Sequence, residues 1–449
     1  MTNEKSGPAT PRQPQAQSHW RRVVAVVLLV YLAFSSLSLS SHPTSPDYSH
    51  LADYCTSSVS PISANEYSAR QESLGSVLHS LNASAYIAEP GPNAFFFANV
   101  STTQWFLSER PLLFIISPEF IDEEIHPKLS VLAPKFEATR AKLLPIPFPK
   151  HKINWIEWPE EANPYELSCY CIIRPTEEGG KVFVDGAMRH FIVDGLQKAL
   201  PESTVLAAPA EVKQLREKKS KAELEILKCA HETTLLSIRE VHKHLYIGIR
   251  ESEARKMMAS ALTAAGLTDG GCLTLFGENA ALPHGSGSDR VLTQGDFALF
   301  DCTASLLGYR SDITRTVALP DTIIPEDHLT IWMRVRTVQD LVYASAKEGV
   351  LTGDLDQLAR KALTDGRYGQ YFTHRLGHGI GIEGHESPYL VGGSKDVIKT
   401  GNAFSNEPGV YIEGKVGVRL EDCFYIDEDG KAVFLTQGVG GMASSPLRP

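Results

Sequence analysis

The sequence lacks the patterns that mark several common classes of protein. No basic block is long enough to follow a phosphate backbone, and the 449 residues carry a formal net charge of -10, so nucleic acid is not an expected partner. Neither a phosphate-binding loop nor a dinucleotide fingerprint is present. The seven cysteines form no CxxC pair and show no zinc-ribbon spacing.

The cysteines leave their own pairing open. Cys169 and Cys171 are separated by one residue, which is too close for an easy bridge between them. Either could pair outward, for example with Cys55. Because seven is an odd number, at least one thiol is free or forms an intermolecular bridge.

A long hydrophobic run is also missing, since the charge-free stretch at 23–39 has 17 residues and a membrane span usually needs about 20. Arg21 and Arg22 precede it. One interpretation is a signal peptide within 21–40, cleaved among the small residues near its end. The other is a short signal anchor, with the rest of the chain lumenal or extracellular. A buried core helix is a weaker interpretation, because no amphipathic partner follows.

Two sequons, at Asn82 and Asn99, favour the secretory pathway and a glycoprotein. Residues 1–20 are polar and predict a disordered tail, and the Ser/Pro-rich residues 41–61 predict a linker.

The composition, 43% hydrophobic and 21% charged, is globular, and the length suggests more than one domain. We predict an N-terminal domain at 62–210, in which helical and strand patterns alternate as in an α/β layer. The expected elements are a helix at 66–81, a strand and turn over 85–97, and strands at 112–117, 152–158, 181–186 and 204–208.

A second domain, at 211–445, begins with one long amphipathic helix pattern over 211–245, inside which Ser220 and Glu223 form a capping-box pattern. A weak internal repeat follows, since helices that run into 247–249 and into 349–351 are each followed by another helix. The repeat predicts a duplicated helix-helix-hairpin unit with a pseudo-two-fold axis. A site between the halves would draw ligands from both.

The first half carries a predicted hairpin, FALFDCTA and SDITRTVA, with a turn around Leu307 and Gly308. If the hairpin is symmetric about the 306/307 bond, Asp301 and Asp312 are directly opposite, about 5 Å apart. Such a pair needs a shared proton or a cation. The alternative is a surface hairpin with two solvated acids.

The second half carries three histidines, His374, His378 and His385, among four glycines, which favours strands with close backbone approaches. A second hairpin centred on Gly414 brings Glu407 towards Glu421. Four carboxylates and one imidazole match two divalent cations, with Mn²⁺, Co²⁺ or Zn²⁺ as candidates. Two cations about 3.5–4 Å apart can deprotonate a shared water. Four unrelated surface acids are the alternative.

The ordered motifs resemble those of the pita-bread metallopeptidases, and above all of Xaa-Pro aminopeptidases and Xaa-Pro dipeptidases (prolidases). They are Asp301…Ser-Asp312-Ile-Thr-Arg-Thr, His374-x3-His378-Gly-Ile-Gly-x3-His385-Glu, Glu407-Pro-Gly-x-Tyr411 and Gly417-Val-Arg-Leu-Glu421-Asp. The resemblance covers roughly 60–445. It implies an α/β (α+β) chain with a C-terminal pita-bread fold after a smaller creatinase-like domain.

The resemblance also implies roles for single residues. Asp301 would chelate one metal, Asp312 and Glu421 would bridge both, and His378 and Glu407 would hold the other. Glu407 would also shuttle a proton.

Four further residues match positions around the metals. His284 would lie near the leaving amine, His385 would bind the substrate carbonyl, and His374 and Arg419 would contribute to the substrate pocket. The family typically prefers manganese. In two places the chain departs from the family pattern: Cys302 puts a thiol beside a ligand, and Ser405-Asn406 precedes Glu407.

These inferences predict a metal-dependent exopeptidase that releases an N-terminal residue when proline follows, through attack by a hydroxide that bridges the metals. Proline lacks the N–H on which ordinary peptidases rely. The alternatives are a strict Xaa-Pro dipeptidase, a creatinase-type hydrolase, which would lack the five ligands, and a metal-free module that binds peptides or proteins. Methionine aminopeptidase fits poorly. The sequence does not decide whether two copies of the chain form a homodimer.

Overall fold

The computed structural model describes Gly7, residues 46–172 and residues 180–449. The contacts divide the chain into Met1–Asp47 and Tyr48–Pro449, and every element below belongs to the second unit. The predicted tail and the predicted signal or anchor segment lie outside the described residues. Among the residues that are described, no helix is both long and apolar enough to span a membrane.

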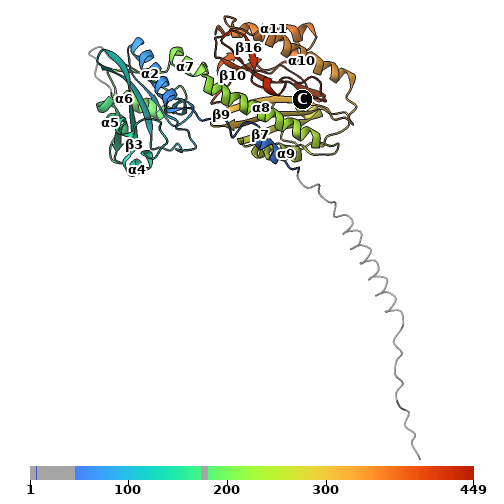
Figure 1. The fold of residues 1–449 in the computed structure, drawn as a ribbon, viewed down its shortest axis with the longest axis horizontal. Coiled ribbons are helices and arrows are strands. Elements are labelled where there is room, and N and C mark those ends of the chain that lie inside the picture. The colour runs from blue at the N-terminus through green and yellow to red at the C-terminus, as the bar shows by residue number, and fades with distance from the viewer. Residues whose placement is uncertain (1–6, 8–45, 173–179) are drawn as a thin grey trace, which may run out of the picture. The chain divides into compact units, whose positions relative to one another are not determined.

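The N-terminal part is an α/β layer around one mixed, six-stranded sheet (Figure 1). Helix α2 (Ala64–Ser80) contacts β1 to β3, and α5 (Pro164–Ile172) and α6 (His190–Ala199) contact β3, β4 and β6. The strand order is β4-β3-β2-β1-β5-β6, with β1 at Ala83–Ala88, β2 at Leu113–Ile121, β3 at Glu124–Pro134, β4 at Asn154–Trp158, β5 at Lys181–Val184 and β6 at Thr204–Ala207.

Both faces of the central strands β1 and β5 are buried, which explains why these strands are nearly continuous apolar runs. In β1, Tyr86 belongs to one core cluster and the flanking Ala85 and Ile87 belong to another. The sequence predicted α2 and five of the six strands, and it missed β3, α5, α6 and the short helix α3 (Pro92–Ala98). Helix α3 begins with Pro92, within the stretch where the sequence predicts a strand and turn; proline is also favoured at the first helical position.

The long helix predicted over 211–245 is two helices, α7 (Ala210–Glu217) and α8 (Lys221–His244). The capping box supplies the break. The Glu223 backbone N–H donates to Ser220 Oγ at 3.2 Å, and the Ser220 N–H donates to Glu223 Oε2 at 2.9 Å. The apolar period continues through the break, so periodicity alone could not show it, whereas the cap marks where α8 begins.

The C-terminal part repeats the order helix, helix, strands. Helices α8 and α9 (Glu251–Ala264) pack on a three-stranded sheet of β7 (Thr268–Phe276), β8 (Ala298–Leu306) and β9 (Tyr309–Val317). Helices α10 (Glu326–Ser345) and α11 (Thr352–Asp365) then precede the remaining strands (Figure 1). These are β10 (Gly377–Gly379), β11 (Glu386–Leu390), β12 (Ala403–Asn406), β13 (Gly409–Ile412), β14 (Val416–Arg419), β15 (Asp422–Ile426) and β16 (Ala432–Phe434).

Short helical turns lie between these elements. They are α4 (Ala138–Ala141) and the 3-10 helices η1 (Ser49–Asp53), η2 (Lys135–Glu137), η3 (Lys150–Lys152), η4 (Gly277–Ala281), η5 (Gly369–Tyr371) and η6 (Gln437–Val439).

The hairpin β8–β9 has a different register from the predicted one. Leu306 pairs with Tyr309, so the turn is the two residues Leu307 and Gly308, both at positive φ (50° and 86°). A two-residue turn of this kind matches the twist of the strands. Asp301 therefore pairs with Thr314, and Asp312 pairs with Thr303. The two aspartates are diagonal neighbours on one face instead of directly opposite residues.

The second hairpin has the predicted register. Val410 pairs with Val418 and Ile412 with Val416, which centres the hairpin on Gly414. The pair Asn406 and Asp422 in β12–β15 continues the same register. Glu407 and Glu421 thus flank the same break between the two ladders, as predicted.

Two disulfides are present within the described residues, and neither was predicted. Cys55 bridges to Cys229 on α8, not to Cys169. Cys272 bridges to Cys302 between the paired strands β7 and β8, so the expected thiol beside Asp301 is a disulfide sulfur. Cys423 is free and buried. These pairings join residues that only the fold brings together.

Candidate metal centre

Carboxylates and histidines from both halves of the C-terminal part converge in one cluster, which contains all five predicted metal ligands. Asp312, His378 and Glu421 each belong to two of its three groups, so these side chains link the groups. The ligand atoms lie within 4.8 Å of one another in three groups, which are Asp301, Asp312 and Glu421; His378, Glu407 and Glu421; and Asp312, His378 and His385.

His378 presents one ring nitrogen to the carboxylates. Its Nδ1 lies 3.1 Å from the carbonyl oxygen of Gly379, which can only accept, so Nδ1 carries a proton. Its Nε2 lies 3.2 Å from Glu407 Oε1 and 3.7 Å from Asp312 Oδ2. Two acceptor oxygens around this nitrogen require either a second proton or a cation between the three groups.

The charges of the carboxylates also indicate a cation. Burial raises the pKa of Asp312 and of Glu421 well above their ordinary values, and the neighbouring carboxylates raise both further. Burial would also raise the pKa of Glu407, but the hydrogen bond and charge of His378 outweigh it and the pKa is lowered. Oε1 of Glu421 is buried without a hydrogen-bond partner among the described residues. Divalent cations would satisfy this oxygen, and the donor set fits them.

Close backbone packing allows β10 to carry His378 into the cluster. A Cβ at Gly377 would lie 2.1 Å from the Ser405 carbonyl oxygen, and one at Gly379 would lie 2.6 Å from the Glu386 carbonyl oxygen. Any side chain at these positions would push the neighbouring strands apart. The glycines around His378 therefore clear space for the backbone, as the sequence predicted.

A chain of hydrogen bonds runs from Asp301 to His374. Arg419 donates from Nη2 to Asp301 Oδ2 at 2.7 Å and from Nη1 to Tyr411 Oη at 2.9 Å. Tyr411 Oη lies 2.7 Å from His374 Nε2, and His374 Nδ1 lies 2.7 Å from the Arg375 carbonyl oxygen. Burial lowers the pKa of His374, so the neutral ring keeps its proton on Nδ1 and accepts at Nε2. Arg419 thus orients a predicted ligand.

Residues behind the cluster hold the strands that carry the ligands. The Asp312 N–H donates to Nε2 of His231 on α8 at 3.3 Å, and burial lowers the pKa of His231 to about 4. Arg315 donates to the Glu421 carbonyl oxygen at 2.7 Å and to Asp422 Oδ1 at 2.8 Å. Both side chains of the Arg315–Asp422 pair are 0% exposed, so this buried ion pair ties β9 to β15.

His385 lies between β10 and β11 at the open side of the cluster. Its ring centroid is 4.0 Å from that of His378, and its residue is exposed. Burial of part of the ring lowers the pKa of His385, and the charges of His378 and Arg375 lower it further. The next residue, Glu386, is anchored by Lys219 Nζ at 2.6 Å, with both side chains 2% exposed. This buried pair positions the loop of His385.

His284 is not joined to the cluster by any hydrogen bond or ion pair that the described residues make. It is exposed in the segment after η4. Its predicted place near a leaving amine therefore stays a prediction.

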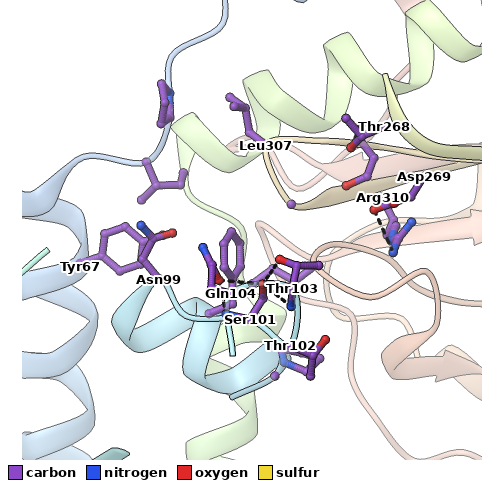
Figure 2. A pocket seen from close by; sticks show the side chains of 18 residues that line it. Tyr67, Asn99, Ser101, Thr102, Thr103, Gln104, Thr268, Asp269, Leu307 and Arg310 are labelled. Atoms are coloured by element: carbon purple, nitrogen blue, oxygen red, sulfur yellow. Dashed lines mark hydrogen bonds and ion pairs between the residues drawn. The ribbon is translucent and has the colours of Figure 1, made fainter. Parts of the chain in front are cut away.

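A cavity of about 460 Å³ lies apart from the predicted site residues. Figure 2 shows Tyr67, Asn99 and the segment 101–104 on one side of it, with Thr268, Asp269, Leu307 and Arg310 on the other. Of its lining residues, Ile382 belongs to the loop of His385, and Ser305, Leu307, Gly308 and Arg310 belong to the hairpin that carries Asp301 and Asp312. None of its polar lining atoms is a buried group without a partner, so the cavity gives no sign of a ligand.

Several residues of the centre were not singled out from the sequence. Thr314 donates to Glu421 Oε2 at 2.7 Å; it lies two residues after Asp312, and strand periodicity could have found it. Tyr411 stood inside a quoted motif without a role. His231 and Arg315 gave no local signal, because their contacts depend on how distant elements pack.

The fold and the cluster together define a pita-bread protein with a hydrolase-type centre for divalent cations. Residues 225–428 match the model of metallopeptidase family M24. An uncharacterized peptidase of Schizosaccharomyces pombe is 35% identical over 417 residues, which is 89% of this chain and 89% of the relative. This chain belongs to metallopeptidase family M24.

Two further comparisons name activities of other proteins. The Xaa-Pro dipeptidase of Pyrococcus furiosus is 32% identical over 263 residues, 58% of this chain and 74% of that protein. The crystal structure of a dipeptidase from Mycobacterium ulcerans is similar with a TM-score of 0.74 and 25% identity, and the match covers 84% of this chain and 97% of that one.

Proposed function

We propose that this chain is a metal-dependent exopeptidase that hydrolyses the bond between an N-terminal residue and a following proline. The observation that carries the proposal is the buried convergence of Asp301, Asp312, His378, Glu407 and Glu421. The preference for proline is supported by the ordered motifs and by the similarity to an Xaa-Pro dipeptidase.

The five ligands would hold two divalent cations, and we propose manganese because oxygen donors predominate. When bound, the cations supply Lewis acidity that lowers the pKa of water to about 7 and polarises the scissile carbonyl. Cobalt and zinc are the alternatives.

The residues of the chain supply binding and proton transfer. The Glu407 side chain is 16% exposed, so it is placed to accept a proton at the edge of the cluster and to deliver it to the leaving nitrogen. His385, on the open side, is placed to donate a hydrogen bond to the carbonyl oxygen as charge develops there. His284 is proposed to assist at the leaving amine.

Two forms of this activity differ in the substrate. The sequence predicts release of the first residue from longer peptides, and the alternative is a strict Xaa-Pro dipeptidase. A metal-free module that binds peptides is the non-enzymatic alternative.

The test is hydrolysis of Ala-Pro and Ala-Pro-Ala by the purified chain, before and after chelation and after Mn²⁺ is restored. Ala-Ala and Ala-Ala-Ala are the matched control peptides. We expect cleavage only before proline, loss with chelator and recovery with Mn²⁺. Cleavage that survives chelation would rule out the cation mechanism, and a metal-free protein that cleaves none of these peptides would favour the binding module.

We also propose that the chain matures in the secretory pathway. The two disulfides support an oxidising compartment. Asn82 is exposed between α2 and β1, whereas the Asn99 amide donates to the Pro145 carbonyl oxygen at 3.0 Å. A glycosidase shift that Asn82→Gln abolishes is the expected result; an unchanged mass after glycosidase would contradict it. The predicted anchor at 23–39 remains a prediction.

A further inference from the structure

Arg375 carries a positive charge beside the metal centre without a negative partner. It lies two residues before the start of β10 and is half-buried. Its guanidinium carbon lies 4.4 Å from the ring centroid of Tyr389. Its side chain makes no ion pair and no hydrogen bond within the part of the chain that the structure describes.

Other arginines of this region have carboxylate partners. Arg419 pairs with Asp301, Arg315 pairs with Asp422 and Arg360 pairs with Asp356. Partial burial of an unpaired guanidinium costs free energy, and the contact with the Tyr389 ring offsets only part of that cost. An anion from outside the chain would offset it, and guanidinium groups bind carboxylates with two parallel hydrogen bonds.

The strand register places Arg375 next to the reacting centre. Tyr389 on β11 is paired directly with His378 on β10, and side chains that face each other in this way are about 5 Å apart. The guanidinium thus lies against the residue that pairs with a predicted metal ligand. Arg375 also follows His374 directly, and His374 Nδ1 donates to the Arg375 carbonyl oxygen at 2.7 Å, so Arg375 lies beside a predicted substrate-pocket residue.

We infer that Arg375, supported on the face of Tyr389, binds a carboxylate of the substrate, namely the free carboxylate of the residue that follows the scissile bond. The inference rests on the proposed function and specifies its substrate class. A site for the free carboxylate favours dipeptides over longer peptides. In Xaa-Pro, this carboxylate lies one residue beyond the scissile carbonyl, and consecutive Cα atoms are about 3.8 Å apart. In a longer peptide a neutral amide takes its place, and it binds a guanidinium more weakly.

An acidic side chain at the first residue is a second source of the same carboxylate chemistry. Three substrates separate the sources. Ala-Pro has the terminal carboxylate, Ala-Pro-amide has neither carboxylate, and Glu-Pro-amide has only the side-chain carboxylate.

The experiment measures kcat and KM for these substrates with the Mn²⁺-loaded wild type and with Arg375→Ala, Arg375→Lys and Tyr389→Leu. Arg255→Ala, an exposed position on α9, is the matched control. We expect Arg375→Ala to raise KM for Ala-Pro about 10-fold or more, the size of one charge-assisted hydrogen bond. We expect kcat to change little, and both constants for Ala-Pro-amide to stay as in the wild type. Arg375→Lys should recover part of the loss, and Tyr389→Leu should show a smaller rise.

Three results would overturn the inference. An equal loss for Ala-Pro and Ala-Pro-amide would make Arg375 a structural residue. Unchanged kinetics for Ala-Pro would exclude contact with its carboxylate. A selective loss for Glu-Pro-amide alone would assign the site to the acidic side chain instead. If the wild type cleaves none of the three, the proposed function itself fails, and this outcome is distinct because it needs no variant.

Discussion

The two hairpins that carry the metal centre each present two carboxylates, but the positions of the two carboxylates in the strand pairing differ. In β8–β9, Asp301 and Asp312 lie inside a continuous ladder and are diagonal neighbours, because the tight turn at Leu307 and Gly308 sets the register. In the second half, Glu407 and Glu421 flank a break between two ladders that share one register. The comparison shows that one face of a strand pair can present two carboxylates in either arrangement.

The largest effect should come from removing a carboxylate that two ligand groups share, one in each hairpin. We expect Asp312→Asn and Glu421→Gln each to lower kcat/KM by about 10³-fold or more, because metal ions contribute several kcal/mol to such reactions. Metal content by mass spectrometry should fall with activity, while circular dichroism stays close to that of the wild type. Asp269→Asn, an exposed residue outside the cluster, is the control. A variant that keeps both metal and activity would contradict a bridging role.

The next largest effect should come from the ion pair that joins the two hairpins. Arg315→Met leaves Asp422 buried without its partner, and breaking a buried pair in this way costs about 3–5 kcal/mol. Chemical denaturation measures the change. The double variant Arg315→Met/Asp422→Leu should regain part of the loss, because no unpaired charge remains. Equal stability of wild type and Arg315→Met would show that the pair does not hold the halves together.

The supports of the two halves also differ, since a disulfide ties β7 to β8 and an ion pair ties the loop of His385. Burial would raise the pKa of Glu386, but Lys219 and Arg216 outweigh it and the pKa lies below its ordinary value of 4.5. Such a carboxyl stabilises the fold above its unfolded pKa, and the stabilisation is lost as pH falls through the folded value.

We therefore expect Glu386→Gln to cost about 1.5–3 kcal/mol at pH 7, the size of a charged hydrogen bond. The difference from the wild type should shrink as pH falls below about 4.5. Denaturation at several pH values measures both effects. A difference that grows towards low pH would contradict the assigned sign.

The smallest effects should come from alanine substitutions in the turns of the two hairpins. Gly308 and Gly414 both have positive φ, 86° and 67°, so alanine at either costs about 1 kcal/mol through backbone strain. A Cβ at Gly308 would also lie 2.5 Å from the Phe95 ring, whereas none of the atoms near Gly414 is within 4 Å. Thermal denaturation should therefore rank Gly308→Ala as the more destabilised variant. The opposite order would mean that Phe95 moves aside freely.

By itself, the sequence determined the features that depend on short range. Ordered motifs identified the family and the candidate ligands, a weak internal repeat predicted the duplicated unit, and the turn at Gly414 set the second register. The capping residues Ser220 and Glu223 marked the start of α8, although the apolar period hid the break before it. Local turn and cap chemistry acts within a few residues, so it can be read from the chain directly.

Only the tertiary structure decided which distant side chains meet. The register of β8–β9 depended on the choice between two adjacent turn positions, and a shift of that choice changed every pair in the hairpin. The bridge between Cys55 and Cys229, the contact of Arg419 with Asp301 and the placement of Arg375 on Tyr389 join residues that have no shared local pattern. Their proximity follows from the packing of whole elements, which no single stretch of sequence encodes.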